Sequence, residues 1–385
     1  MYNPSLADMR IAFIIDTLYP FELGGAHKRV WEIGRRLSDD HDVHVFGMKY
    51  WEGADSIRQD GMVYHGVCQK RELYSNGRRS FSQPIIFAAS LLKEIRGMDF
   101  DIIDCQKSGY FHFFSAKYLE LRTNATLIGT FNEVWGDYWD EYLGIFGRIG
   151  KLIENQTLKL PSHIITISNQ NQSELIGLGY SSNNITVIPD GIGFQEINQA
   201  SPSNTSFDVL YAGRLARHKN VDLLLKAIKV ASSQPDTPIS CGIIGKGPEM
   251  EELKRQSEIL GLSEQVEFLG FLEDIDDVYS YMKSAKVFVL PSSREGAGLV
   301  TLEANACGTP SITPRFEMNA ATEVIDHGTN GYLCDPDPKS MASSILETIQ
   351  QSPNMREDCI KYSKEFEWGV IAESTEQVYE QSVKE

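Results

Sequence analysis

The stretch Asp208–Asn220 reads DVLYAGRLARHKN and indicates how the chain folds. Its first residues form a short apolar run typical of a buried strand, and Gly213 follows directly. Glycine lets the chain turn sharply off a strand, and apolar residues at helical spacing begin near Val221. The order of strand, turn and helix recurs along the chain, which is typical of a parallel sheet with helices on both faces.

This pattern occurs in two blocks. In the first block, we expect strands at Arg10–Asp16, Asp42–Gly47, Phe100–Cys105, Ala125–Thr130 and His163–Ser168, and helices at Lys28–Leu37 and Ile85–Ile95. In the second block, we expect strands at Asp208–Ala212, Ile239–Ile244, Val266–Leu269, Val287–Leu290 and Pro310–Thr313, and helices at Val221–Ser232, Glu249–Leu260, Val278–Ser284 and Val300–Ala306. The sequence therefore predicts an α/β fold of two facing, doubly wound, Rossmann-like domains. Because such sheets bind ligands at the carboxyl ends of their strands, we expect the site in a cleft between the domains.

The length of 385 residues also favours two domains, at about 100–200 residues each. We expect a disordered extension at 1–8, an amino-terminal domain at 9–194, and a carboxyl-terminal domain at 207–365. A stretch rich in Asn, Ser and Pro at 195–206 is the predicted linker. Residues 366–385 are the predicted final helix.

Composition excludes several classes of protein. The formal net charge is −17, from 36 basic and 53 acidic side chains, and such a chain repels nucleic acid. No apolar run approaches the roughly 20 residues of a membrane-spanning helix, and no segment resembles a signal peptide. The six cysteines lack close pairing, which fits neither a disulfide framework nor a zinc site. We therefore expect a soluble, cytoplasmic protein with reduced thiols and no metal site.

Two cations follow the strand at Asp208–Ala212. Arg214 and Lys219 lie five residues apart at its carboxyl end, ahead of a predicted helix. Arginine can bind two phosphate oxygens at once and lysine acts as a point charge, so the pair could clamp a diphosphate. The alternative is a solvated basic loop. The turn Gly245-Lys246-Gly247-Pro248 follows the next strand, and by itself it indicates only a tight turn before a helix.

The most specific segment is Ser292–Pro310, which reads SSREGAGLVTLEANACGTP. A strand leads to Glu295, and a helix is predicted to begin near Gly298, so its amino-terminal N–H groups could bind phosphate. Glu303 then lies within that helix. A carboxylate accepts two hydrogen bonds, which suits the paired hydroxyls of a ribose or a hexose. The alternative for each glutamate is a solvated or capping residue.

Together these segments resemble glycosyltransferase family four. The resemblance rests on Glu295 and Glu303 with seven residues between them, on Gly213-Arg214-Leu215 with Lys219, on the Gly-Lys-Gly-Pro turn, and on Gly24-Gly25 after the first strand. It covers residues 10–380 and is most specific over 208–335. It implies the GT-B fold, no metal ion, and retaining transfer of a hexose from a nucleotide-diphosphate sugar, which is a substrate and not a cofactor.

The resemblance also implies roles for individual residues. Arg214 and Lys219 would hold the donor diphosphate, Glu303 the ribose, and Glu295 the hydroxyls of the donor sugar. The remaining positions implied to bind the donor are Gly25, Gly213, Phe271, Leu272, Gly298, Leu299 and Val300. Phe271 and Leu272 match the place of the base. The final helix would cross back to the amino-terminal domain, which is implied to bind the acceptor, whether a glycan, a lipid-linked compound or a small molecule with a hydroxyl group.

Asn132 departs from the family pattern, which usually has a histidine there. Asparagine can bind a sugar hydroxyl or the attacking oxygen, but it cannot act as a base or carry charge. Asn132 therefore leaves open a catalytically weak subunit that binds nucleotide sugars. A nucleotide-sugar epimerase of the same fold is a second alternative, although the spacing of Glu295 and Glu303 favours the transferase. A dinucleotide-dependent oxidoreductase is disfavoured because neither first turn carries Gly-x-Gly-x-x-Gly.

Two further segments of the first block have two interpretations each. The aromatic residues Trp135, Tyr138, Trp139 and Tyr142 either pack a loop or line an acceptor groove. The basic residues Lys70, Arg71, Arg78 and Arg79 form either a solvated loop or a contact with an anionic lipid or acceptor. The second interpretation would place the amino-terminal domain at the membrane surface.

Overall fold

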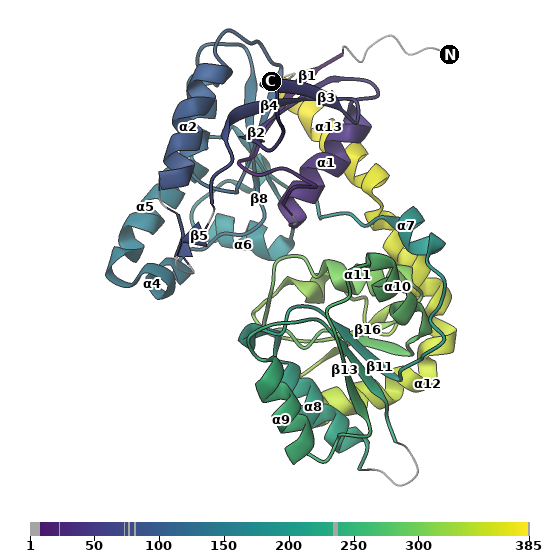
Figure 1. Cartoon of the computed structure of the whole chain (residues 1–385). Helices are drawn as coiled ribbons and strands as arrows, with labels where there is room; N and C mark the ends of the chain where they lie inside the picture. Colours follow the sequence, from purple (N-terminus) through teal and green to yellow (C-terminus); the bar gives the residue numbers. More distant parts are fainter. Residues whose placement is uncertain are drawn as a thin grey trace, which may run out of the picture. The chain divides into compact units, whose positions relative to one another are not determined.

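The chain forms two compact units, seen in a computed structural model that describes residues 8–22, 24–72, 74–75, 78–80, 82–233 and 238–383 (Figure 1). Unit 1 runs to Asp190 and resumes at Trp368, and unit 2 is Gly191–Glu367. Each unit contains one large sheet, as the sequence predicts for two Rossmann-like domains. Most of the extension predicted at 1–8 lies outside the described residues.

The sheet of unit 1 has eight strands in the order β10-β9-β8-β7-β1-β2-β4-β3. All neighbours pair in parallel except β3 and β4, which form an antiparallel edge. The bounds are β1 (Arg10–Ile14), β2 (Asp42–Lys49), β3 (Ser56–Gln59), β4 (Met62–Gln69), β7 (Ile102–Gln106), β8 (Thr126–Phe131), β9 (His163–Thr166) and β10 (Ile185–Val187). A separate pair joins β5 (Tyr74–Ser75) to β6 (Arg78–Arg79).

Helices cover both faces of this sheet. They are α1 (Gly25–Leu37), α2 (Ser82–Glu94), α3 (Phe111–Glu120), α4 (Tyr138–Leu143), α5 (Gly147–Leu158), α6 (Asn169–Gly177) and α13 (Trp368–Val383). Alternate residues of β1 point to opposite faces. Ile11 and Phe13 therefore pack in the cluster that holds α1 and α13, while Ala12 and Ile14 pack in the cluster that holds α2, α3 and α5.

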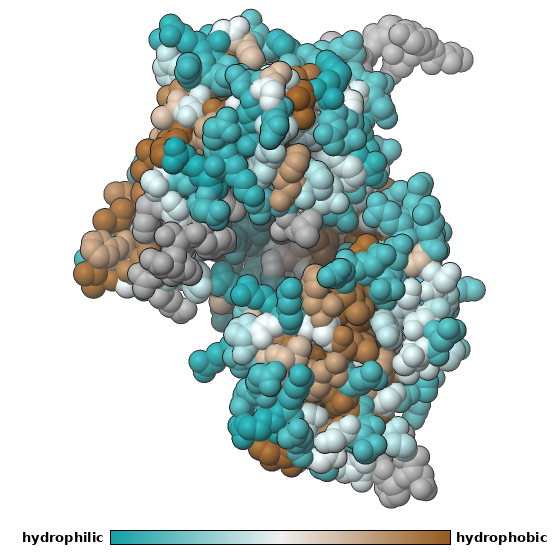
Figure 2. Space-filling model, in the orientation of Figure 1, coloured by the Kyte–Doolittle hydropathy of each residue, from teal (hydrophilic) through white to brown (hydrophobic). Residues whose placement is uncertain are grey.

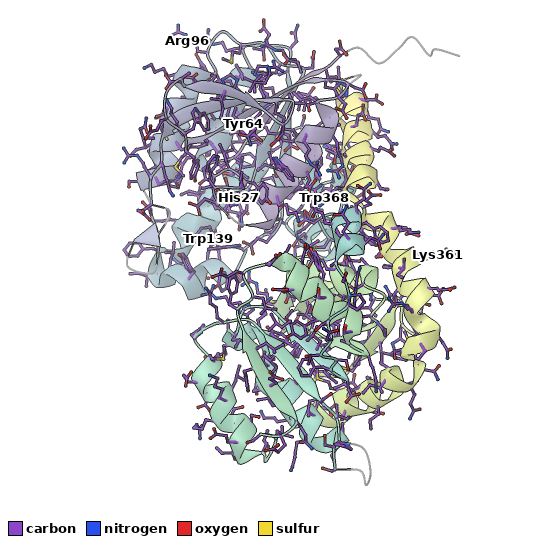
Figure 3. The ribbon with its side chains drawn as sticks, turned by 45° about the vertical axis from the view of Figure 1, so that its right-hand side comes forward. His27, Tyr64, Arg96, Trp139, Lys361 and Trp368 are labelled. Atoms are coloured by element: carbon purple, nitrogen blue, oxygen red, sulfur yellow. The ribbon has the colours of Figure 1, made fainter. Side chains whose placement is uncertain are left out.

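Helix α13 belongs to unit 1 because its inner side chains are anchored there. Trp368, at its first residue, is buried and is labelled in Figure 3. Tyr379 donates a hydrogen bond of 2.5 Å to the buried carboxylate of Asp104 on β7, which also accepts bonds from Gln106 and Thr130. Burial raises the pKa of Asp104 despite these donors. The chain thus leaves unit 1, builds unit 2, and returns to finish unit 1.

The sheet of unit 2 has six parallel strands in the order β13-β12-β11-β14-β16-β18. The strands are β11 (Val209–Ala212), β12 (Cys241–Ile244), β13 (Val266–Gly270), β14 (Val287–Val289), β16 (Ser311–Pro314) and β18 (Gly331–Cys334). The helices are α7 (Phe194–Gln199), α8 (Val221–Ala231), α9 (Met250–Ile259), α10 (Ile275–Ser284), α11 (Leu299–Ala306) and α12 (Pro338–Ser363). A short parallel pair joins β15 (Arg294–Glu295) to β17 (Met318–Asn319).

The stretch 195–206 differs from the predicted linker. Its first residues belong to helix α7, whose Ile197 is fully buried in the core of unit 2. Farther along, Lys283 donates hydrogen bonds to the carbonyls of Asn198 and Ala200 and fixes this segment. The units divide between Asp190 and Gly191 instead. A polar composition suggested a linker, but one buried side chain and a lysine cap suffice to hold the segment in place.

Several elements have no counterpart in the sequence-based expectations, among them β4, β18, α3, α5 and α12. Helix α12 is 26 residues long. Its N-cap residue is Asp337, whose side chain accepts hydrogen bonds from the N–H groups of Lys339 and Ser340. Pro353 lies inside the helix, and a proline in a sequence normally indicates the end of a helix. No helix in the described part of the chain is long and apolar enough to cross a membrane.

Candidate active site

The predicted donor site lies at the switch point of the unit 2 sheet. Strand β11 has β12 on one side and β14 on the other, so the connections after β11 and β14 run in opposite directions. Doubly wound sheets bind ligands where the strand order reverses, outside the carboxyl ends of the strands. The turn from Gly213 follows β11, and the loop that contains Glu295 follows β14. The topology thus brings the two most specific segments of the sequence to one edge.

Glycines allow two of these loops to touch through their backbones. A side chain on Gly245 would place its Cβ 1.9 Å from the carbonyl oxygen of Gly213, and one on Gly247 would lie 2.1 Å from that of Leu215. The N–H of Leu215 also donates to the carbonyl of Lys246 at 3.0 Å. The Gly-Lys-Gly-Pro turn therefore packs against the Gly213 loop and fixes the backbone from which Arg214 projects.

Lys219 and Glu295 form the central ion pair. Lys219 Nζ lies 2.6 Å from Glu295 Oε1, and their side chains are 19% and 14% exposed. The two loops are also joined by the backbone, because the carbonyl of His218 accepts hydrogen bonds from the N–H and hydroxyl of Ser293 at 2.8 and 3.1 Å. An ammonium has three donors, so Lys219 can hold Glu295 and still bind an anion. Burial, and then the charge of Lys219, lower the pKa of His218.

Arg214 and Lys219 differ in their surroundings. Arg214 is exposed, and within the described ranges no ion pair involves it. Its carbonyl accepts a hydrogen bond from the buried hydroxyl of Tyr211 at 3.0 Å, which fixes the backbone of the turn. The backbone that carries the guanidinium is therefore fixed, and the guanidinium itself is exposed to solvent, where an anion can reach it.

Helix α11 begins at the site. Gly298 precedes it in the left-handed conformation, with φ of 66°, and a side chain there would lie 2.5 Å from Ala321 Cβ. Only glycine combines this φ with this close approach. The N–H groups of Leu299 and Val300, at the first turn, have no intrahelical partner, so the helix start favours an anion.

Glu303, one turn into α11, is held by Tyr279 of α10. The Tyr279 hydroxyl donates to Glu303 Oε1 at 3.3 Å, and Tyr279 is 1% exposed. Burial, and then the Glu303 carboxylate, raise the pKa of Tyr279, so it stays a donor. Tyr279 is a residue that the sequence reasoning missed, because only the packing of α10 on α11 brings the two side chains together.

Phe271 and Leu272 follow β13 at the same edge. Phe271 is 56% exposed, and Lys246 Nζ lies 4.1 Å from its ring centroid. Leu272 is half-buried against the core of unit 2. An exposed aromatic ring with one face covered by a cation is able to stack a planar group on its other face. Lys246 is the second residue whose contact could not be read from the sequence.

Gly25 and Asn132 belong to unit 1. Gly25 is the first residue of α1, and a side chain there would lie 3.8 Å from the carboxylate of Asp190, which forms a buried pair of 2.9 Å with Arg29. Asn132 follows β8, and its carbonyl accepts a hydrogen bond of 2.7 Å from Asn171. Asn132 Oδ1 is buried, and no hydrogen-bond partner for it occurs among the residues that the structure describes.

A buried carboxylate organises the aromatic residues that follow Asn132. Glu154, on the inner face of α5, accepts hydrogen bonds from the hydroxyl of Tyr110, the N–H groups of Trp135 and Gly136, and the indole of Trp139, at 2.8–3.1 Å. Trp139 is labelled in Figure 3. The aromatic residues 135–142 are packed against each other around Trp135 and remain half-buried. The structure therefore favours a packed loop that still presents ring surface.

The structure thus brings the unit 2 residues together at one sheet edge, with Lys219 and Glu295 in direct contact, and places Gly25 and Asn132 on unit 1. This arrangement of two Rossmann-like units defines the GT-B class of fold. Two family models match adjoining parts of the chain: Glycosyltransferase Family 4 matches residues 23–195, and Glycosyl transferases group 1 matches residues 194–366. The chain belongs to glycosyltransferase family four.

Related sequences agree with this assignment. Glycogen synthase of Mycobacterium tuberculosis is 28% identical over 247 residues, which are 61% of this chain and 58% of that protein. D-inositol 3-phosphate glycosyltransferase of Corynebacterium jeikeium is 28% identical over 257 residues, which are 60% of each chain. The matches thus span less than two thirds of these relatives.

Solved structures show the same fold over nearly the whole chain. Sucrose-phosphate synthase of Thermosynechococcus elongatus has a TM-score of 0.75 at 20% identity, covering 96% of this chain and 98% of that one. HepE of Anabaena in complex with UDP has a TM-score of 0.73 at 20% identity, covering 97% and 100%. At these identities the similarity establishes the GT-B fold.

Proposed function

We propose that the protein is a retaining glycosyltransferase that transfers a hexose from a nucleotide-diphosphate sugar to an acceptor hydroxyl in the cytoplasm. The observation that carries the proposal is the Lys219–Glu295 pair at the switch point of unit 2, between an exposed arginine and a helix start. A cation that also holds a sugar-binding carboxylate suits a ligand in which a diphosphate adjoins a sugar. Solved relatives in complex with UDP or with ADP support a nucleotide donor.

The proposed donor contacts combine the roles implied by the family resemblance with the grouping of these residues in unit 2. Arg214, Lys219 and the N–H groups from Gly298 to Val300 bind the diphosphate. Glu303, held by Tyr279, accepts hydrogen bonds from the ribose hydroxyls. Phe271 and Leu272 contact the base, and Glu295 binds hydroxyls of the hexose. These groups belong to unit 2, and Gly25 at the start of α1 is the donor-binding position proposed on unit 1.

The proposed reaction breaks the bond between the anomeric carbon and the diphosphate oxygen. The acceptor oxygen forms its bond to the same face of that carbon, and the acceptor proton passes to the departing diphosphate oxygen. Negative charge grows on the diphosphate as the bond breaks, and Arg214, Lys219 and the start of α11 stabilise it. Fixed cations and dipoles of this kind contribute about 3–4 kcal/mol per lost group in well-studied sites. No side-chain base is required, which makes asparagine at position 132 compatible with transfer.

The test is a panel of UDP, GDP and ADP sugars. The matching donor at about 100 times its dissociation constant should stabilise the protein by about 2.7 kcal/mol in a thermal-shift assay. With a matching acceptor, the protein should release the nucleoside diphosphate and form an α-linked product from an α-linked donor. Donor binding without release in the presence of glycan, lipid-linked and small acceptors would favour the catalytically weak subunit. A changed sugar still attached to its nucleotide would identify an epimerase.

A further inference from the structure

The outer face of α5, together with the 3-10 turn Gly144–Phe146 that precedes it, carries an uncovered group of large apolar side chains. Ile145, Phe146, Ile149 and Leu152 are 88%, 61%, 55% and 60% exposed. Figure 2 shows hydrophobic surface, in brown, at the end of unit 1 where α4 and α5 lie in Figure 1. Single exposed apolar residues are normal, but four within eight residues form a continuous patch that indicates an interaction site.

The fold of unit 1 does not need these four side chains. The inner face of α5 is formed by Gly147, Gly150, Glu154 and Leu158, which are buried against the aromatic loop and the sheet. Gly150 is required there, because a side chain would meet the ring of Trp139 at 2.4 Å. The exposed residues recur on the opposite side at helical spacing. Helix α5 therefore has two different faces: the inner one packs in the core of the unit, and the outer one is exposed.

The apolar patch continues onto neighbouring helices. Helices α2, α3 and α5 cover the same face of the unit 1 sheet. On α3, Phe114, Tyr118 and Leu121 are 43%, 48% and 76% exposed, and on α2, Ile85 is 50% exposed. Together with the α5 patch, these residues make one flank of unit 1, which we call the apolar flank.

The charges on this flank are suited to an anionic surface. On the outer face of α5, the exposed charged residue among the apolar side chains is Arg148, and Lys159 follows the helix end. The one acidic residue within α5, Glu154, is buried and turned inward. Lys151 binds Asp137 and Asp140 at 2.7 and 2.6 Å, which neutralises part of the negative charge beside α4. An apolar helix face bordered by cations contrasts with the chain's net charge of −17.

We propose that the apolar flank docks on an anionic lipid bilayer, with Ile145, Phe146, Ile149 and Leu152 inserted at the level of the headgroups and Arg148 and Lys159 at the lipid phosphates. Interfacial helices bind membranes in this way, through apolar burial and attraction of basic residues to anionic lipid. A second copy of the chain is a poorer partner, because a twofold contact over this patch would bring two Arg148 side chains together. The inference is independent of the proposed catalytic activity.

This location differs from the loop of Lys70, Arg71, Arg78 and Arg79 that the sequence indicated for a membrane contact. Arg78 and Arg79 form β6, and their side chains are outside the described part of the structure. Lys70 lies 3.6 Å from Glu22 and covers the ring of Tyr50, so its charge is partly used within unit 1. The loop was a candidate for the membrane contact because of its basic residues alone, whereas α5 is a candidate because of its exposed apolar side chains.

Cosedimentation of the full chain with vesicles tests the inference. The wild-type protein should bind vesicles of phosphatidylcholine with 30% phosphatidylglycerol and bind pure phosphatidylcholine far more weakly, and it should release as the salt concentration rises. The double variant Ile149→Asn/Leu152→Asn should lose about tenfold or more in vesicle affinity. Arg148→Gln should lose about fivefold, with a weaker dependence on salt.

The matched control is Ile259→Asn, which removes a 69% exposed isoleucine from helix α9 of unit 2 and should leave vesicle binding unchanged. The substituted side chains are exposed, so circular dichroism should report native folding in every variant. Absence of wild-type binding to anionic vesicles, or equal binding by the double variant, would overturn the inference. A light-scattering mass of two chains that becomes one chain in the double variant would also overturn it, since the flank would then be a self-association surface.

Discussion

The carboxyl edges of the two sheets are built in different ways. In unit 2, backbones approach so closely that Gly245, Gly247 and Gly298 admit no side chain, and charged residues project from the fixed loops. In unit 1, the edge is shaped by side chains, above all by Glu154 and the aromatic residues around it. A site for a constant ligand such as a diphosphate can be made from backbone and glycine, whereas a site whose ligand varies is better made from replaceable side chains.

The largest effect should come from the charge at the unit 2 edge. Lys219→Ala should lower turnover by about 100- to 1,000-fold, because the departing diphosphate loses its least exposed cation. Initial rates of nucleoside diphosphate release at saturating donor measure this loss. Lys226→Ala, which removes an exposed lysine paired with Asp222 on α8, is the control and should keep wild-type turnover. Near-normal rates in Lys219→Ala would remove this residue from the proposed site.

A smaller effect, on stability, should follow from adding a side chain where the backbones of Gly247 and Leu215 touch. Gly247→Ala should lower the free energy of unfolding by about 3 kcal/mol, because the new Cβ would lie 2.1 Å from the carbonyl oxygen of Leu215. Gly369→Ala is the matched control, since nothing lies within 4 Å of its Cβ near the start of α13. Urea denaturation should show a loss for the first variant and none for the second. Equal stability of both would mean that the two loops do not depend on their close approach.

At the edge of unit 1, replacing a hydrogen-bond acceptor by a donor at Glu154 should be enough to lower stability. Glu154→Gln keeps the shape but directs an NH₂ group at donors, so the free energy of unfolding should fall by about 2 kcal/mol. Glu52→Gln, on an exposed loop, should have no effect in the same urea titration. If Glu154→Gln also raises the KM for the acceptor while that for the donor stays constant, the aromatic loop is part of the acceptor site. An unchanged stability would contradict the central role given to this carboxylate.

The smallest effect concerns pH, at the opposite end of the unit 1 strands. His65 bonds to His44 at 2.8 Å and to Ser56 at 3.0 Å, and burial, with the nearby charge of His44, lowers the pKa of His65 to about 4. An unfolded histidine titrates near 6.5, so between these values the unfolded chain binds the extra proton. Stability that is complete above about pH 6.5 should therefore decline by about 1–2 kcal/mol as the pH falls to 5.

Urea titrations at pH 7.5 and pH 5.0 measure this decline. His65→Asn should reduce it, because the group that binds the extra proton is gone, and His327→Asn, at an exposed position in unit 2, should leave it unchanged. The same pH dependence in His65→Asn and wild type would assign the proton uptake to other groups.

The sequence predicted the unit 2 edge well and the unit 1 edge poorly, for a physical reason. The contact between Lys219 and Glu295 arises from loops that directly follow strands, and parallel strands bring such loops to one edge whatever the details of packing. The contacts of Glu154 and Tyr279 depend instead on how a helix is rotated against its neighbour. A single sequence contains no local signal for that rotation, so these two positioning residues became visible only in the structure.

The same reasoning explains the errors in domain organisation. The polar composition of 195–206 concealed helix α7, because few side chains, chiefly Phe194 and Ile197, attach this helix to the core. The return of the chain to unit 1 was predicted from the family resemblance and is seen in the contacts of Trp368 and Tyr379.

The route of the chain has a consequence for the order of synthesis. Unit 2 is inserted into unit 1, and its ends meet where the N–H of Ile192 donates to the carbonyl of Phe366. A ribosome therefore completes unit 2 before it makes α13, which supplies Trp368 and Tyr379 to the first core. The unit that starts first is the last to be finished. If domains fold as units during translation, unit 2 can complete its fold before unit 1, because unit 1 lacks α13 until the end of synthesis.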